Sequence, residues 1–232
     1  MHILLTRPLE DCKELIIKFQ SLGHKVSHFP VIKIESKKHE EIKFKEFSGF
    51  IFTSSNAIKN LNIKNINKNL FCFCVGSATE KTARLNGFQN VYSADGNVNN
   101  LKEIILQNFN YKDGKMLYVS GEIISSNLDK DLILEGYSIK RLINYSVLPI
   151  KDLDLKFIED LKSSLPDIVF IYSQNSAKNF LYLIKKYQLV DYLMDTNLMC
   201  IGEKTSSVLN EIKWKKIFLF NPGEEEFLLY KI

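Results

Sequence analysis

The sequence contains no long apolar segment. None of its apolar runs approaches the roughly 18 residues that a membrane-spanning helix requires. The first residues, Met1–Pro8, lack the basic start, the longer apolar stretch and the small-residue cleavage site of a signal peptide. We therefore expect a cytoplasmic protein with no membrane partner. A composition of 45% hydrophobic and 25% charged residues is typical of a soluble globular protein.

Arginine is scarce in this chain. Arg7, Arg84 and Arg141 are the only three, and lysine supplies the rest of the basic residues behind a net charge of +4. The lysines are scattered, and no basic run alternates with aromatic residues, which argues against nucleic acid as a partner. A small anionic ligand is compatible with this mild positive charge.

Cysteine and histidine are also few, with four of each. Cys72 and Cys74 are two residues apart on one apolar segment, and no group of cysteines and histidines has the spacing of a metal site. The sequence has neither a G-x-G-x-x-G nor a G-x-x-x-x-G-K-[ST] motif, which weakens dinucleotide and P-loop phosphate binding. We place no Ser/His/Asp or Cys/His arrangement for nucleophilic catalysis and expect no bound metal.

The sequence does contain a regular alternation of short apolar runs and amphipathic segments. Residues 3–6 are predicted to form a strand, apolar side chains recur at helical spacing over residues 9–22, and residues 25–29 form the next strand. Gly23 ends the helix, because glycine adopts a left-handed backbone at little cost. Repeated along the chain, this pattern predicts an α/β fold with parallel sheets that helices cover on both faces.

The chain also repeats itself. The segments 49–61 and 167–180 each combine a buried strand, a hydroxyl-rich turn and the start of a helix, and Cys74–Thr79 resembles Cys200–Thr205. In outline, residues 4–30 resemble residues 117–149. Because the match to the first thirty residues comes last in the middle block, the simplest arrangement has one domain inserted into another.

We therefore predict two similar three-layer domains. Residues 1–34 and 150–232 form a discontinuous domain, residues 35–149 form the inserted one, and two extended segments link them across a cleft. A single ten-stranded sheet is the alternative, although it explains the repeat less well.

Candidate binding residues lie where predicted strands end, because ligands of parallel α/β sheets bind outside the carboxyl ends of the strands. Helix N-termini at this edge favour anions. Ser54, Ser173 and Asn175 also fit a second interpretation as ordinary helix caps. Arg7 follows a strand directly, with a surface ion pair as the alternative, and Tyr145 fits simple packing on a linker equally well.

Several of these segments occur together in one known family. The relevant segments, in chain order, are Leu4–Pro8, Phe52–Ala57, Cys74–Thr79, Asp95–Asn97, Tyr145 with Pro149, and Ile201-Gly202 with Thr205. Their order and spacing over essentially the full length resemble the uroporphyrinogen-III synthase family.

The resemblance implies a cofactor-free lyase of tetrapyrrole and haem biosynthesis. Its substrate is hydroxymethylbilane, a linear tetrapyrrole with an acetate and a propionate on every ring. The reaction loses water, inverts the terminal ring through a spiro intermediate and closes the macrocycle. The resemblance also implies two α/β domains on a two-stranded linker with the substrate in the cleft. Nothing in the sequence demands more than a monomer, and the upstream enzyme that makes hydroxymethylbilane is a candidate partner.

The positions that match the family's motifs imply roles for individual residues. Tyr145 matches the family's candidate proton donor; because a phenol is a weak acid with a pKa near 10, we expect it to assist the reaction without being indispensable. The positions expected to bind substrate are Arg7, Thr53, Ser54, Asn56, Thr79, Ser173 and Thr205.

The sequence departs from the family at two places. Many members carry arginines in the turn that is Ser120–Ile124 here, and a basic residue where this chain has Asn56. Either lysines elsewhere or backbone N–H groups are expected to replace them. Two alternatives to the enzyme are a two-domain protein that binds a small anion and a paralogue that kept the fold without the activity.

Overall fold

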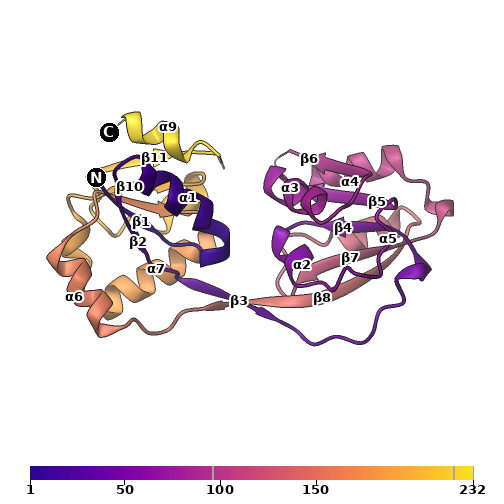
Figure 1. The fold of residues 1–232 in the computed structure, drawn as a ribbon, viewed down its shortest axis with the longest axis horizontal. Coiled ribbons are helices and arrows are strands. Elements are labelled where there is room, and N and C mark those ends of the chain that lie inside the picture. Colours follow the sequence, from indigo (N-terminus) through magenta and orange to yellow (C-terminus); the bar gives the residue numbers. More distant parts are fainter. Residues whose placement is uncertain (96, 222, 232) are drawn as a thin grey trace. The chain divides into compact units, whose positions relative to one another are not determined.

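The computed structural model describes residues 1–95, 97–221 and 223–231. Gly96, the centre of the Asp95–Asn97 segment, therefore lies outside the described residues. The chain divides into two compact units: unit 1 comprises Met1–Lys33 and Leu148–Ile232, and unit 2 comprises Ile34–Val147 (Figure 1). Within the described ranges, no helix is long and apolar enough to cross a membrane. Among these same residues, no three His, Cys, Asp or Glu side chains are grouped to hold a metal ion.

Unit 1 is built on a five-stranded parallel sheet. Its strands are β1 (His2–Leu5), β2 (Lys25–His28), β9 (Ile168–Ile171), β10 (Asn197–Cys200) and β11 (Lys216–Leu219). Its helices are α1 (Leu9–Ser21), α6 (Leu155–Ser163), α7 (Gln174–Lys186), α8 (Glu203–Ser207) and α9 (Glu225–Leu228), with 3-10 turns η3 (Asp191–Leu193) and η4 (Leu229–Lys231). The strand order is β11-β10-β9-β1-β2, and neighbouring strands are parallel.

Helices cover both faces of this sheet, which explains why its central strand β9 is apolar throughout. Leu4 and Val169 face the side on which α6 and α7 pack. Ile3 and Phe170 face the opposite side, where α1 and α9 pack. Each of these four side chains is fully buried, so β1 and β9 form the centre of the core.

Unit 2 is built on a six-stranded sheet. Its strands are β3 (Ile32–Ser36), β4 (Phe47–Phe52), β5 (Phe71–Val75), β6 (Val91–Ala94), β7 (Lys115–Gly121) and β8 (Ser138–Pro149). Its helices are α2 (Ser55–Lys59), α3 (Ser77–Leu85), α4 (Val98–Asn108) and α5 (Leu128–Leu134), with 3-10 turns η1 (Phe44–Glu46) and η2 (Tyr111–Asp113). The strand order is β3-β8-β7-β4-β5-β6, and the pairs β8-β7, β7-β4, β4-β5 and β5-β6 are parallel.

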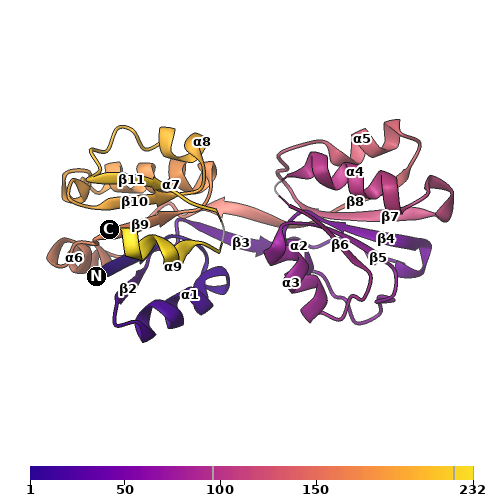
Figure 2. The same ribbon diagram turned by 90° about the horizontal axis from the view of Figure 1, so that it is seen from above.

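The unit 2 sheet is also the middle of three layers. Figure 2 shows α4 and α5 on one side of it and α2 and α3 on the other. Phe50 and Phe52 face α2 and α3, whereas Ile51 and Phe73 face α4 and α5. The prediction of an α/β fold with parallel sheets and helices on both faces is confirmed, and the described strands form two sheets instead of one ten-stranded sheet.

The two sheets share one strand order. Reading β6-β5-β4-β7-β8 in unit 2 against β11-β10-β9-β1-β2 in unit 1 matches β4 with β9 and β7 with β1. Ser54 caps the helix after β4, and Ser173 caps the helix after β9, each accepting a backbone N–H. The repeated sequence segments therefore occupy equivalent places in the two sheets.

One predicted boundary is wrong. The sequence suggests a strand that ends at Ile143 and a separate linker over residues 145–150, but β8 continues to Pro149. The reason is β3, which lies beside β8 and pairs with its backbone: the Lys37 N–H donates to the Asn144 carbonyl at 2.8 Å, and the Ile150 N–H donates to the Val31 carbonyl at 2.9 Å.

Candidate functional site

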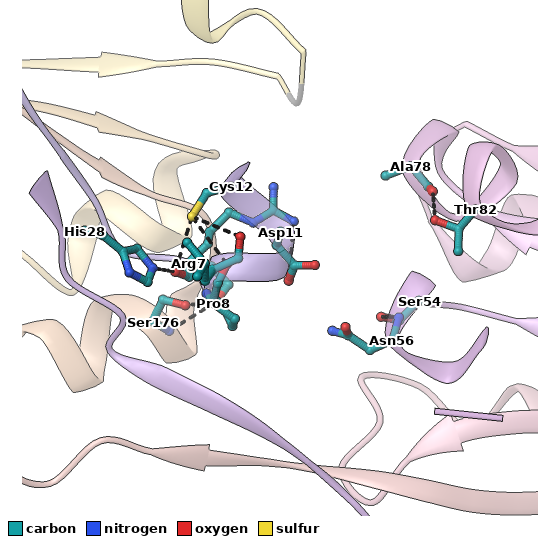
Figure 3. Close-up of polar contacts among 12 residues, drawn as sticks. Arg7, Pro8, Asp11, Cys12, His28, Ser54, Asn56, Ala78, Thr82 and Ser176 are labelled. Carbon is teal, nitrogen blue, oxygen red and sulfur yellow. Dashed lines mark hydrogen bonds and ion pairs between the residues drawn. The ribbon is translucent and has the colours of Figure 1, made fainter. Parts of the chain in front are cut away.

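In unit 1, Arg7 leaves the carboxyl end of β1 with a fixed direction. A ring N–H of His28 donates to the Arg7 carbonyl (Nε2···O 2.8 Å). The guanidinium lies over the ring of Tyr172, 4.7 Å from its centre, and Nη2 is 3.9 Å from an Asp11 carboxylate oxygen. Figure 3 shows the Arg7 side chain beside Asp11, with Pro8 and His28 around its backbone. Because the side chain keeps 31% of its exposure, the expected ion pair leaves the charge accessible to a ligand.

The aromatic ring of Tyr172 packs against the Arg7 guanidinium. The sequence analysis did not identify Tyr172 as a site residue. Burial raises its pKa well above the usual value for tyrosine, and the nearby Glu225 carboxylate raises it further, while Arg7 acts in the opposite direction. The phenol therefore stays protonated, and its ring forms a cation–π contact with the Arg7 guanidinium. A cation over an aromatic face is stabilised by about 0.5–1 kcal/mol when exposed and more when desolvated.

Ser173 caps α7 in the next strand-to-helix turn of unit 1. Its Oγ accepts the Ser176 N–H at 3.1 Å and donates to the Ser176 hydroxyl at 2.9 Å. Ser173 itself is exposed. The cap interpretation is therefore correct for Ser173, and its position still leaves it accessible at the end of the sheet.

Thr79 and Thr205 occupy equivalent turns in units 2 and 1. Each follows a glycine with a left-handed backbone, Gly76 (φ 79°) and Gly202 (φ 73°), and each donates its N–H to that glycine's carbonyl at 3.1 Å. Both threonines are only 4% exposed. The structure thus buries both threonines, and their backbone N–H groups hold the two glycine turns.

In unit 2, three predicted residues lie together at the end of β4. The Thr53 hydroxyl is 3.2 Å from the Tyr118 hydroxyl, and Ser54 Oγ accepts the Asn56 N–H at 3.2 Å. All three predicted residues are partly exposed. Figure 3 shows Ser54 and Asn56 at the start of α2. Burial raises the pKa of Tyr118, so this phenol stays protonated beside Thr53.

Tyr145 lies in β8 at the same carboxyl edge, paired in register with Gly121 of β7. Its residue is 7% exposed, and its backbone carbonyl accepts the Glu122 N–H at 3.0 Å. Among the described residues its hydroxyl has no hydrogen-bond partner, and the oxygen is not one of the buried polar atoms that lack one. The hydroxyl oxygen is therefore not fully enclosed by the protein.

The turn after β7 holds a guanidinium that comes from a neighbouring strand. Arg141 of β8 donates from Nε to Ser120 Oγ (2.8 Å) and from Nη2 to the carbonyls of Gly121 (2.9 Å) and Glu122 (3.1 Å). The Glu122 carboxylate accepts bonds from Lys37 Nζ (2.6 Å) and the Ser146 hydroxyl (2.8 Å), and these lower the pKa of Glu122. The turn and its neighbours thus form one hydrogen-bonded group.

This geometry agrees with a family assignment. The family model described as Uroporphyrinogen-III synthase HemD matches residues 13–219. The chain belongs to the uroporphyrinogen-III synthase family. Its activity is that of a carbon–oxygen lyase in haem biosynthesis.

Solved structures of the family share the fold. Uroporphyrinogen-III synthetase from Helicobacter pylori is 20% identical, with a TM-score of 0.63, and the match covers 100% of this chain and 99% of that chain. A mutant uroporphyrinogen III synthase from the extremely thermophilic bacterium Thermus thermophilus is 15% identical, with a TM-score of 0.55 and coverage of 100% and 97%. No curated protein sequence matches the chain.

Arg141 brings a guanidinium to the turn at which many family members carry arginines. The sequence places no arginine within Ser120–Ile124, but the structure brings a guanidinium to this turn from β8. Neither of the two expected substitutes, lysines or backbone N–H groups, included it. The only sequence signal is the scarcity of arginine, because nothing local to Arg141 indicates which turn it reaches.

Proposed function

We propose that the chain converts hydroxymethylbilane to uroporphyrinogen III, with residues at the carboxyl ends of the strands contacting the substrate. One observation carries the proposal: the Tyr145 hydroxyl lies at this edge of the unit 2 sheet, is not fully enclosed, and has no hydrogen-bond partner among the described residues. A free phenol at a ligand-binding edge is suited to donate a hydrogen bond to a departing hydroxyl.

Dehydration is the step that needs such a donor. The substrate's carbon–oxygen bond breaks as the pyrrole nitrogen supplies electrons, and the hydroxyl leaves as water. The proton that its oxygen gains is balanced by the one that the free α-carbon of the terminal ring loses when the macrocycle closes. The Tyr145 hydroxyl donates a hydrogen bond to that oxygen. The terminal ring then attacks through its substituted carbon, inverts by way of the spiro intermediate and closes the macrocycle. No oxidant or reductant enters the balance, because the products are the macrocycle and one water.

Each unit, taken by itself, offers donors suited to carboxylates. Arg7 offers a partly exposed guanidinium in unit 1, and Ser173 marks the N-terminus of α7, where free N–H groups favour anions. In unit 2, Thr53, Ser54 and Asn56 present hydroxyl and amide groups at the end of β4. Holding a flexible chain in a reactive conformation contributes to the rate by orientation alone.

The finer assignments follow the family resemblance. We place the reaction in the cytoplasm, with a monomer as the active form and the upstream hydroxymethylbilane-forming enzyme as the supplier of substrate. Thr79 and Thr205 hold the Gly76 and Gly202 turns from inside, so we assign them a supporting role in binding.

The direct test is to add the purified protein to freshly prepared hydroxymethylbilane, oxidise the products and separate the isomers. Without an enzyme the substrate closes to the type I isomer, so predominant type III product is the expected result. Type I alone from well-folded protein would contradict the proposal and leave a non-catalytic anion-binding protein or an inactive paralogue.

Replacing Ser173 with aspartate separates the cap from a role in binding. Aspartate caps helices as well as serine, so the free energy of unfolding in urea should stay within about 0.5 kcal/mol of that of the parent protein. A new carboxylate repels those of the substrate by about 1 kcal/mol at about 4 Å in water, which raises KM roughly five-fold. Ser173→Asn, which caps without charge, is the control. Equal KM values for the two variants would show that no carboxylate binds near α7.

A further inference from the structure

Gly121 packs closely against the hydroxyl end of the Tyr145 side chain. A Cβ atom on Gly121 would be 2.8 Å from Tyr145 Cζ, 2.9 Å from Cε2 and 3.1 Å from the hydroxyl oxygen. All three nearest atoms belong to the end of the Tyr145 side chain that carries the proposed donor. We propose that Gly121 and Arg141 are positioning residues that set the location of the Tyr145 hydroxyl; this inference rests on the proposed role of Tyr145.

The backbone conformation at position 121 does not require a glycine. Gly121 ends strand β7, and it is not among the described glycines with a left-handed backbone. An alanine would therefore fit the local backbone without strain, and the three atoms nearest to its methyl group would all belong to Tyr145. The ring is itself packed in the core on the α2 and α3 side of the sheet, so an added methyl group displaces the hydroxyl end.

A β-bulge turns Tyr145 toward Gly121. Along β7 and β8, Ser120 pairs with Ile143 but Gly121 pairs with Tyr145, so Asn144 is an extra residue in β8. Such a bulge changes the direction of the side chains that follow it. The bulge is held in place, since the buried Asn144 amide donates to the Ala57 carbonyl of α2 at 2.8 Å.

Arg141 holds the backbone of Gly121, which is the partner of the Tyr145 side chain in this contact. Its three hydrogen bonds join Ser120, Gly121 and Glu122 to β8, and the Glu122 N–H returns a bond to the Tyr145 carbonyl. The glycine and the tyrosine backbone are thus connected through one closed set of bonds. Loss of the Arg141 bonds frees the carbonyls of Gly121 and Glu122. The Gly121 backbone that packs against the Tyr145 ring can then move.

The test is a double-mutant cycle with Gly121→Ala and Tyr145→Phe, with kcat and KM measured for formation of type III product. If Gly121 acts through the hydroxyl, Gly121→Ala lowers kcat at least ten-fold with KM within two-fold in the parent protein. In the Tyr145→Phe protein the same change lowers kcat less than two-fold, because no hydroxyl remains to be displaced.

Gly49→Ala in β4 is the matched control. Its Cβ would meet Met116, Phe109 and Phe71 at 3.3–3.4 Å, so it disturbs the same sheet without touching Tyr145, and kcat should be unchanged. If Gly121→Ala does not fold, Arg141→Lys replaces it in the cycle, with Arg84→Lys as its control. Arg84 lies on α3 and binds Glu80 and the Val91 carbonyl.

The outcomes separate the two proposals. An equal loss of kcat from Gly121→Ala in both backgrounds, with Tyr145→Phe itself slow, overturns the positioning role and leaves the proposed function intact. A Tyr145→Phe protein with parental kcat overturns the role of the hydroxyl, and the positioning role with it.

Discussion

Replacing Tyr145 with phenylalanine is expected to lower kcat about 100-fold, or about 2.7 kcal/mol, which is the lower end of the range for a positioned proton donor. A phenol is a weak acid, and orientation of the substrate continues without it, so activity should remain measurable. Stability should hardly change, because the hydroxyl has no hydrogen-bond partner among the described residues. The measurements are the initial rate of type III formation and unfolding in urea.

Tyr137→Phe is the matched control for this substitution. Tyr137 is equally buried, at 7% exposure, and lies in the same unit, but its hydroxyl donates to the Phe109 carbonyl at 2.9 Å. This variant should lose about 1 kcal/mol of stability and keep its kcat. The opposite pattern, a stable Tyr145→Phe protein with parental kcat, would remove Tyr145 from the mechanism.

Replacing Arg7 with alanine is expected to raise KM roughly 30-fold with a smaller change in kcat. A hydrogen bond to a charged group contributes about 2 kcal/mol, and the Arg7 guanidinium is held toward solvent by the Tyr172 ring and the Asp11 carboxylate. Because the bond is between a cation and an anion, the difference in KM should shrink as salt rises from about 0.05 M to 0.5 M.

Arg84→Ala is the control for the loss of one positive charge in Arg7→Ala. Arg84 is also a surface arginine, half exposed, and its Nε is 2.9 Å from Glu80. Its removal changes the net charge by the same amount and should leave KM within two-fold of the parent value. If Arg7→Ala and Arg84→Ala have equal KM values, Arg7 binds no carboxylate of the substrate and its ion pair with Asp11 is its only role.

The elements of the two sheets were predicted where local sequence alone determines structure. The run 168–171 is apolar at every position, and a strand buried on both faces needs such a run. Capping by Ser54 and Ser173 was the alternative to their predicted role in substrate binding, and both do cap helices, because a serine before an amphipathic segment accepts the first free N–H groups. The family assignment also came from the sequence, because the motifs keep their order along the whole chain.

The candidate site was predicted less completely, because several of its contacts join residues that are distant in sequence. Tyr172 lies under Arg7 only because β9 pairs with β1. The burial of Thr79 and Thr205 follows from how their helices pack on the sheets, which local sequence does not specify.

The sequence by itself determined the parallel α/β architecture, the helix caps and the family, because hydrophobic period, capping chemistry and motif order are all local or linear properties. Only the tertiary structure decided that β8 continues beside β3, that Arg141 supplies a guanidinium to the Ser120–Glu122 turn, and that Gly121 lies under Tyr145. These last two contacts depend on the register of β7 against β8. One extra residue, Asn144, shifts that register by a single position, and a one-residue shift moves a side chain to the other face of a strand.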